Sequence, residues 1–354
     1  MAKRTRMRRI AAVDGAGRGV VVKQRVPAPK AGQVLIHVEA ATISPGSELS
    51  RARRLRAGEA GNTNTVQKLG YQNSGRVIEV GRGVKRFKPG DRVAAFGGGY
   101  AYIADFAVVP QNLCCPLPDK VSYAEGAYGN VMLTGLHAIR RGEAQIGEDL
   151  LVVGLGIVGQ FAAQFGRIAG LNVMAWDRLP FRCRIARQCG AHAAMNVQSK
   201  DALDEARRFT EDRGFDLAVV AIGGDGTDAV QQTKAALKTS PDGHTMGRVV
   251  LVGAVNATIR GGSGFGNADV RSAARTGPGY HDDEWEHGRT DYPHTFMRWT
   301  TRSNFELALK LMARGDLKVK PLTTHTLPIG RIDEVISAHL DEPHKTLGTV
   351  LVMD

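Results

Sequence analysis

A glycine-rich turn between a hydrophobic strand and a hydrophobic helix constrains this chain more than any other feature. The stretch "LLVVGLGIVGQFAAQFG" places Gly154, Gly156 and Gly159 at the point where a short apolar run gives way to a helical one. In this context the pattern G-x-G-x-x-G is typical of dinucleotide binding. The first glycine permits a tight turn, the second lets the backbone approach a pyrophosphate, and the third lets helix and strand pack closely. The sequence therefore predicts a dinucleotide site that includes Ile157 and Val158 at the helix N-terminus.

An acidic residue at the end of the next predicted strand indicates which dinucleotide is bound. The stretch "LNVMAWD" ends in Asp177, 23 residues after Gly154. A carboxylate at this place accepts hydrogen bonds from the hydroxyls of an adenosine ribose and repels a 2′-phosphate. We therefore expect NAD rather than NADP, with Gly253 lining the same site. A glycine-rich turn that binds no ligand is the alternative.

From about residue 126 the pattern alternates between strands and helices. The strand-like runs are "DLLVVG", "LNVMAW", "DLAVVAI" and "RVVLVGA", and the helical stretches are 157–169, 179–189, 201–213 and 226–237. This alternation predicts βαβ units around a buried parallel sheet. Residues 7–125 instead have the pattern of short strands broken by turns. The segment 256–300 is expected to be a long loop, which in a compact domain is usually functional or disordered.

Composition excludes several classes of protein. The net charge of +12 comes from scattered lysines and arginines, and aromatic residues make up only 6%, so we expect a solvated basic surface and no nucleic-acid partner. No apolar run reaches about 18 residues, which argues against a membrane span. The four cysteines form no CxxC pair and are expected to be free thiols in the cytoplasm.

The order of these parts, together with two local motifs, resembles the medium-chain dehydrogenase/reductase family. The motifs are "VGRGVKRFKPGDRV" at 80–93 and "PLTTHTLPIGRIDEV" at 321–335. The resemblance implies an α/β protein, with a GroES-like β-rich domain beside a Rossmann domain that has a doubly wound parallel sheet. The domains expected from it are 1–125 with 316–354 for the GroES-like part, and 126–315 for the NAD-binding part, including a substrate-loop insertion at 256–300.

The resemblance also carries expectations about function and assembly. It implies an NAD-dependent oxidoreductase in which Arg182 stacks on the adenine. It further implies a homodimer or homotetramer that pairs through the last strand of the nucleotide-binding sheet, near 268–274.

The positions that bind zinc in this family are occupied differently here. Zinc members use a cysteine, a His-Glu pair and a further cysteine or acid. The aligned positions in this chain are Pro45, Tyr71, Gln72 and Asn130. None of these is a thiolate, an imidazole or a carboxylate, the side chains that zinc prefers. We therefore expect no metal, and a metal site rebuilt as a hydrogen-bonding pocket wall. The alternative is that these residues only pack.

Without zinc, alcohol oxidation requires a general base. Glu48 and Tyr71 are the candidates, because the resemblance places both in the family's cleft. Ser47 takes the place of the family's proton-relay hydroxyl. A role in a turn or in packing is the alternative for each of the three.

The segment 276–300 carries many groups suited to binding a sugar-like ring. The residues predicted to bind substrate are Gln72, Asn130, Tyr280, His281, Tyr292 and Arg298. A metal site made of His281, Glu284 and His287 is disfavoured, because the glycines and Pro293 predict a loop rather than a helix.

Taken together, the sequence predicts a zinc-independent, NAD-dependent dehydrogenase. Its small-molecule substrate is expected to be a cyclic polyhydroxylated compound with a secondary alcohol. A quinone or enoyl-type reductase is one alternative, although Asp177 argues against the NADPH that such enzymes prefer. A non-catalytic dinucleotide-binding protein is the other.

Overall fold

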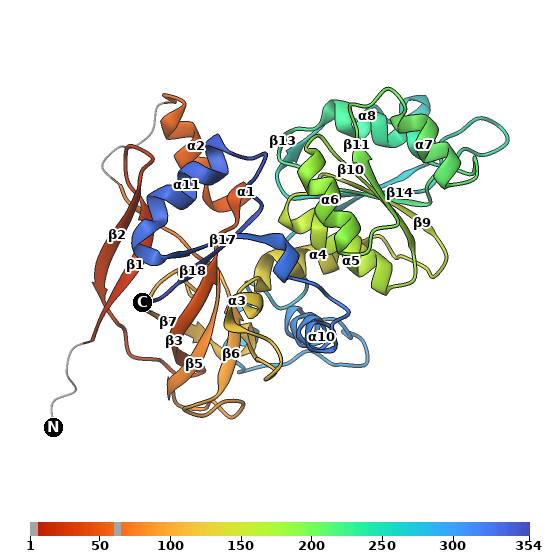
Figure 1. Cartoon of the computed structure of the whole chain (residues 1–354). Coiled ribbons are helices and arrows are strands. Elements are labelled where there is room, and N and C mark those ends of the chain that lie inside the picture. Colours follow the sequence, from red (N-terminus) through yellow and green to blue (C-terminus); the bar gives the residue numbers. More distant parts are fainter. Residues whose placement is uncertain (1–5, 60–64) are drawn as a thin grey trace. The chain divides into compact units, whose positions relative to one another are not determined.

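Two units of the chain pack around separate cores in the computed structural model, which describes residues 6–59 and 65–354 (Figure 1). The first unit comprises the described residues up to Asn130, together with Gly277–Gly315 and Thr323–Asp354. The second unit is Val131–Thr276 with Asp316–Leu322. This division differs from the sequence expectation in three places, the first being that 126–130 belongs to the first unit. The segment 277–315 joins the first unit rather than the nucleotide-binding one, and 316–322 joins the second.

The second unit is built on a six-stranded parallel sheet. Its order is β11-β10-β9-β12-β14-β16. This is the doubly wound order: the second and third strands are added on one side of the first strand and the fourth to sixth on the other, which leaves a crevice at the carboxyl ends of the first and fourth strands. The strands are β9 (Asp149–Val153), β10 (Asn172–Asp177), β11 (Ala193–Asn196), β12 (Leu217–Val220), β14 (Arg248–Val252) and β16 (Asp269–Ala273), beside a small pair, β13 (Gly224–Asp225) and β15 (Val255–Asn256).

Helices cover both faces of this sheet. Successive side chains of a strand point to opposite faces, so an apolar strand packs against helices on both sides. Leu150 of β9 packs against α5, where a Cβ on Gly166 would lie 2.4 Å from its Cδ2 atom. The next residue, Leu151, belongs to a cluster with Ala206 of α7 and Val230 of α8. All five residues of β9 are buried, which accounts for its unbroken apolar sequence. The helices are α4 (Gly129–Arg141), α5 (Ile157–Ile168), α6 (Pro180–Gln188), α7 (Ala202–Phe209) and α8 (Thr227–Ala236).

The first unit is β-rich, as the sequence predicts. A seven-stranded sheet has the order β17-β18-β3-β5-β6-β8, with β7 also paired to β3, and a smaller sheet has the order β2-β1-β4. The last strands of the chain therefore complete a sheet begun near its start, so the expected GroES-like and Rossmann combination is confirmed. The strands are β1 (Met7–Val13), β2 (Gly19–Arg25), β3 (Gln33–Thr42), β4 (Gln67–Lys68), β5 (Gln72–Val80), β6 (Arg92–Phe96), β7 (Phe106–Pro110), β8 (Cys114–Pro116), β17 (Thr323–Pro328) and β18 (Gly348–Val352).

The segment after 276 is anchored to the first unit and is not an insertion of the nucleotide-binding unit. Trp285 is completely buried, and its carbonyl accepts a hydrogen bond of 2.5 Å from the Asn112 side chain. The Gln111 side chain donates to the carbonyl of His287 at 2.9 Å. The helices of this unit are α1 (Pro45–Glu48), α2 (Ser50–Arg56), α3 (Tyr123–Gly126), α9 (Asp283–Glu286), α10 (Thr301–Arg314) and α11 (Ile332–Asp341).

Residues 316–322 are held by the second unit through a reciprocal pair of hydrogen bonds. The backbone N–H of Lys318 donates to the Gln164 side chain at 2.7 Å, and that side chain donates back to the Lys318 carbonyl at 2.9 Å. Gln164 lies in α5, so this short segment belongs with the nucleotide-binding sheet rather than with the β-rich unit.

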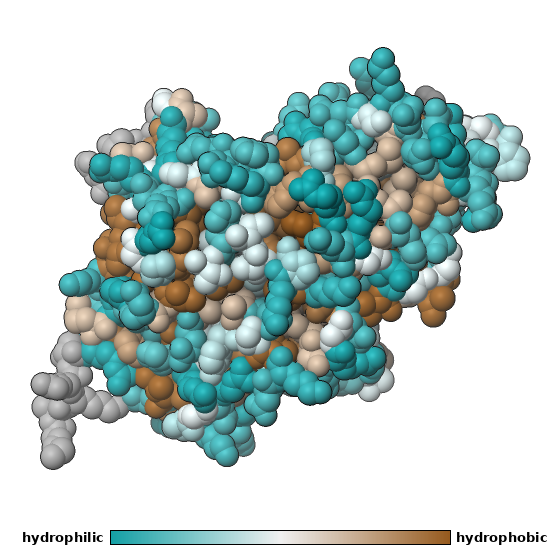
Figure 2. Space-filling model, in the orientation of Figure 1, coloured by the Kyte–Doolittle hydropathy of each residue, from teal (hydrophilic) through white to brown (hydrophobic). Residues whose placement is uncertain are grey.

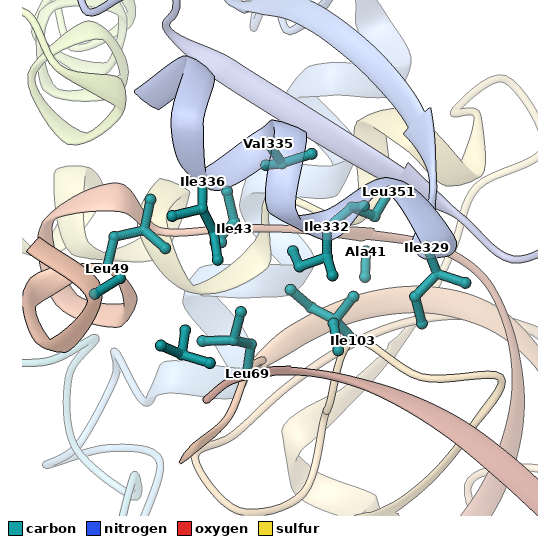
Figure 3. Packing of buried hydrophobic residues seen from close by; sticks show 13 residues of the cluster. Ala41, Ile43, Leu49, Leu69, Ile103, Ile329, Ile332, Val335, Ile336 and Leu351 are labelled. Atoms are coloured by element: carbon teal, nitrogen blue, oxygen red, sulfur yellow. The ribbon is translucent and has the colours of Figure 1, made fainter. Parts of the chain in front are cut away.

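A hydrophobic cluster in the first unit fixes the segments that flank the candidate site. Ile43, Leu49 and Leu69 project from these segments toward Ile332 and Ile336 of α11 (Figure 3). All five side chains have an exposed fraction of 1% or less. Because Ile43 precedes Ser44, Leu49 follows Glu48 and Leu69 precedes Gly70, this cluster helps to fix the positions of Ser44, Glu48 and Gly70.

The face drawn in Figure 2 is mostly hydrophilic, with hydrophobic residues in scattered patches. Among the described residues, no helix combines the length and the apolar character needed to cross a membrane. The four cysteines, Cys114, Cys115, Cys183 and Cys189, are free and buried. Burial raises the pKa of each thiol, so these cysteines are poor nucleophiles.

Candidate active site

Glu48, at the end of the short helix α1, is a buried carboxylate held by two backbone N–H groups. Its Oε2 atom accepts from Ser44 at 2.7 Å and its Oε1 atom accepts from Gly70 at 2.5 Å. Its exposed fraction is 5%. Burial raises the pKa of Glu48 to about 7, although the two hydrogen bonds act in the opposite direction. A carboxylate tuned to this range is suited to general base catalysis near neutral pH.

Gly70, which supplies the second N–H, occupies a position that only glycine fits. Its φ of 114° lies in a region that other residues avoid, and a Cβ there would lie 2.2 Å from the backbone nitrogen of Ile103. The glycine therefore brings the main chain close to the segment at 103 and directs an N–H at Glu48. The next residue is Tyr71, so the carboxylate and the phenol are adjacent through this turn.

Tyr71 lies in a cluster of hydroxyl and amide groups. The side chains of Ser44, Ser47 and Asn130 are in hydrogen-bonding contact with its hydroxyl and act to lower its pKa. Burial and the negative charge of Glu48 outweigh them and hold the pKa of Tyr71 well above its ordinary range. Tyr71 is therefore protonated at neutral pH and can donate a hydrogen bond or relay a proton, but it is not itself a base.

Gln72 supports this cluster from behind. Its side chain is completely buried, its Oε1 atom accepts from the backbone N–H of Asn130 at 2.9 Å, and its Nε2 atom donates to the Thr42 carbonyl at 3.4 Å. The structure thus places Gln72 beneath Asn130, at the first turn of α4. This is a supporting position behind the hydrogen-bonding pocket wall that the sequence predicts.

Of the four residues predicted from the segment 276–300, Tyr280 is connected to the turn at Tyr71 through two adjacent glycines. The Tyr280 hydroxyl accepts from the backbone N–H of Gly98 at 2.8 Å, and the neighbouring Gly97 N–H donates to the Tyr71 carbonyl at 2.8 Å. The rings of Tyr280 and His281 are stacked, with their centroids 4.0 Å apart.

Tyr292 and Arg298 are engaged within their own segment. The Tyr292 hydroxyl donates to Asp282 at 2.6 Å, and its ring stacks on Trp285. The Arg298 guanidinium lies over the ring of Trp299 at 4.7 Å. The structure therefore brings Tyr280 and His281 toward Tyr71, while the contacts of Tyr292 and Arg298 stabilise the loop.

The dinucleotide turn has the geometry that its glycines predict. A Cβ on Gly159 would lie 1.8 Å from the Gly154 carbonyl oxygen, so no side chain fits where α5 meets β9. Gly154 has a φ of 91°. A Cβ on Gly156, by contrast, would meet nothing within 4 Å, which leaves open space where a pyrophosphate would approach the backbone. Gly253 follows β14 at the same carboxyl edge of the sheet, with a φ of 79°.

Asp177 ends β10 and is held firmly beside this turn. Its Oδ2 atom accepts from the Leu155 N–H at 2.6 Å, and its Oδ1 atom accepts from the Leu179 N–H at 2.8 Å. A guanidinium nitrogen of Arg182 lies 3.8 Å from Oδ2. The Nε atom of Arg182 is buried and has no hydrogen-bond partner within the described residues. The acid, the partly satisfied arginine and the open space at Gly156 fit a bound adenosine dinucleotide.

No group of three or more histidine, cysteine, aspartate or glutamate side chains in residues 6–59 and 65–354 is arranged to hold a metal ion. His287 is buried, with its ring nitrogens 3.3 Å from the Gln33 side chain and 2.9 Å from the Asp283 carbonyl. Its contacts are therefore those of a packed side chain.

Comparison with known proteins agrees with this fold. Residues 30–119 match the alcohol dehydrogenase GroES-like domain, and residues 158–275 match the zinc-binding dehydrogenase family model. Sorbitol dehydrogenase of Bacillus subtilis is 30% identical over 259 residues, which are 64% of this chain and 70% of that protein. Quinone oxidoreductase of Rattus norvegicus is 31% identical over 238 residues, which are 64% of this chain and 66% of that protein.

Among solved structures, an Escherichia coli oxidoreductase/dehydrogenase of unknown specificity has the same fold. It superposes with a TM-score of 0.80 at 20% identity, covering 99% of this chain and 100% of that one. The fold and the matches define a two-domain oxidoreductase. The chain belongs to the medium-chain dehydrogenase/reductase family.

Proposed function

We propose that this protein oxidises a secondary hydroxyl group of a cyclic polyhydroxylated compound, with NAD as the hydride acceptor and without zinc. The single observation that carries the proposal is the buried Glu48 carboxylate beside the Tyr71 phenol. The similarity to a sorbitol dehydrogenase supports a polyol substrate. We also propose that the protein works in the cytoplasm, which its four free thiols support.

Oxidation of an alcohol removes a hydride from carbon and a proton from oxygen, leaving a ketone. Bound NAD would supply the hydride acceptor. The Tyr71 phenol, which is protonated at neutral pH, accepts a hydrogen bond from the substrate hydroxyl and takes up its proton as it gives its own proton to Ser44 or Ser47. Ser44 and Ser47 contact that phenol and pass the proton on, and Glu48 takes it up because its pKa is near 7.

The donor groups at the family's metal positions support a reaction without zinc. Pro45 has no side-chain donor atom, and Gln72 is buried with both polar atoms of its amide in hydrogen bonds. Tyr71 holds its proton, and Asn130 is a neutral amide that contacts it. These residues do not fit a zinc ion, which prefers thiolate, imidazole or carboxylate ligands.

A second candidate function is quinone reduction, which the similarity to a quinone oxidoreductase favours. The carboxylate of Asp177 supports the first candidate, because it would repel the 2′-phosphate of NADPH. The two candidates therefore differ in their nucleotide as well as in their substrate.

A metal-depletion assay tests the proposal. The purified chain is dialysed against a chelator, its zinc content is measured by elemental analysis, and NAD reduction is followed with myo-inositol, sorbitol and other polyols. We expect less than stoichiometric zinc and full activity on at least one polyol after depletion. One tightly held zinc per chain, or turnover only of quinones with NADPH, contradicts the proposal.

A further inference from the structure

A buried carboxylate outside the proton-transfer cluster holds His281 in an uncommon backbone conformation. His281 has a φ of 72°, in the left-handed region that residues other than glycine seldom adopt. The Oε1 atom of Glu286 accepts a hydrogen bond from the His281 N–H at 2.7 Å. Glu286 is 3% exposed, and neither the proton route nor the dinucleotide site uses it. A conformation of this kind persists only where neighbouring groups enforce it.

The turn at His281 brings two aromatic rings together. The rings of Tyr280 and His281 stack at an interplanar angle of 29°. The Tyr280 ring also packs edge-on against Phe96, at 5.5 Å between centroids, and its hydroxyl accepts from Gly98. Tyr280 is partly buried, whereas His281 is exposed. The pair is therefore a rigid aromatic surface with one end open to solvent.

This aromatic pair reaches the proton-transfer cluster through two strands of the same unit. Phe96 of β6 lies directly opposite Gln72 of β5, and residues paired in this way project from the same face of a sheet. The side chain of Gln72 accepts from Asn130, which in turn contacts the Tyr71 phenol. Phe96 and Gln72, which lie side by side on one face of the sheet, thus connect Tyr280 to the residues around Tyr71.

We propose that Glu286 is a positioning residue, and that the Tyr280–His281 pair it holds forms the wall of the substrate site against which a ring-shaped polyol packs. The inference deepens the proposed function and rests on it. The face of a cyclitol ring presents C–H groups, which pack against an aromatic surface, while its hydroxyls bind polar groups at the edge. An open-chain polyol has no such face, so the aromatic pair distinguishes the two shapes.

Binding measurements on the full chain test this inference without requiring turnover. The dissociation constants of myo-inositol and sorbitol are measured by titration calorimetry for the wild type, Glu286→Leu, Glu286→Gln and His281→Asn. Leucine removes the acceptor of the His281 N–H, whereas glutamine keeps an oxygen there. Asparagine tolerates the left-handed conformation but removes the ring. We expect Glu286→Leu and His281→Asn to weaken myo-inositol binding roughly 3- to 10-fold, with sorbitol binding unchanged and Glu286→Gln close to the wild type.

Glu284→Leu provides the matched control, because Glu284 lies on the same helix, is exposed and pairs with Arg289. It should bind both polyols as the wild type does. Unchanged myo-inositol binding in Glu286→Leu overturns the inference, as does equal weakening of sorbitol or failure of Glu286→Gln to restore binding. Polyol binding that follows the expected pattern without NAD reduction would contradict the proposed function alone. Absence of myo-inositol binding by the wild type overturns the inference, whereas the proposed function fails only if none of the polyols is oxidised.

Discussion

The Oε1 atom of Glu48 accepts a hydrogen bond from the backbone N–H of Gly70 at 2.5 Å. This contact joins α1 to the turn before β5, two segments whose apolar neighbours, Leu49 and Leu69, share one hydrophobic cluster. The carboxylate is thereby fixed next to Tyr71 by packing and by main-chain hydrogen bonds together. Rigid placement of this kind is what a proton acceptor requires, because its efficiency depends on geometry before pKa.

Removing the phenol hydroxyl should interrupt proton transfer. We expect Tyr71→Phe to lower kcat roughly 100-fold on the polyol substrate, because the contact to Ser44 and Ser47 is lost. NAD affinity, measured by fluorescence titration, should be unchanged. Tyr123→Phe makes the same chemical change in α3 and serves as the control. Equal kcat values for the two variants would show that Tyr71 takes no part in the reaction.

Stability should depend on pH through Glu48. Burial raises its pKa from 4.5 to about 7, so between these values the folded chain holds a proton that the unfolded chain has released. The free energy of unfolding therefore falls as the pH rises through this window, by about 3 kcal/mol at 1.36 kcal/mol per pH unit.

Denaturant unfolding of the wild type and Glu48→Gln at about pH 5 and about pH 8 measures this contribution of Glu48 to the free energy of unfolding. The contributions of other titrating groups are the same in both proteins and cancel in the difference. The wild type should lose stability relative to the variant at the higher pH. If the difference in free energy of unfolding between the two proteins is the same at both pH values, or favours the wild type more at the higher pH, the pKa of Glu48 is not raised.

The choice of nucleotide should depend on Asp177. Repulsion between its carboxylate and a 2′-phosphate is on the order of 1 kcal/mol or more, so NAD should bind at least several-fold more tightly than NADP. Asp177→Asn should reduce the ratio of NAD affinity to NADP affinity, mainly by improving NADP binding. Asp201→Asn, at the exposed start of α7, should leave it unchanged. Equal affinities for the two nucleotides in the wild type would refute the assignment of NAD.

Assembly should involve β16, which is the edge strand of the six-stranded sheet. We propose that two copies pair through this edge about a two-fold axis. Val270 is 39% exposed there, and Val270→Asp would place like charges close to the axis. Light scattering should give a dimer or tetramer for the wild type and a smaller species for the variant. Ile146→Asp, at an exposed residue outside the strands, is the control, and a monomeric wild type would exclude this interface.

Local patterns predicted the nucleotide-binding unit well, because its signals are continuous in sequence. Gly154 and Gly159 owe their roles to neighbours within a few residues, and the expected helices at 157–169, 179–189 and 226–237 differ from α5, α6 and α8 by one residue at one or both ends. The helix expected at 201–213 is shorter, since α7 ends at Phe209 and the chain enters the left-handed region at Glu211 and Asp212.

The segment 277–315 could not be assigned from sequence, because its anchors are distant. The Asn112 side chain binds the Trp285 carbonyl across 173 positions, and no local pattern indicates such a contact. Glu286 was missed for a similar reason. It is one of several acids in "HDDEWEH", and only its burial against His281 distinguishes it from the exposed Glu284.

The kcat of Glu48→Gln shows whether Glu48 is the proton acceptor. Glutamine keeps the size of the side chain but cannot take up the proton, so kcat on the polyol substrate should fall at least ~100-fold while NAD affinity stays the same. The wild-type kcat should rise with pH toward a plateau above about 7, the pKa to which burial raises Glu48, and this rise should be absent from the variant. Glu59→Gln, an exposed acid, should behave as the wild type. A Glu48→Gln enzyme with kcat within a few-fold of the wild type and the same pH profile would contradict the account.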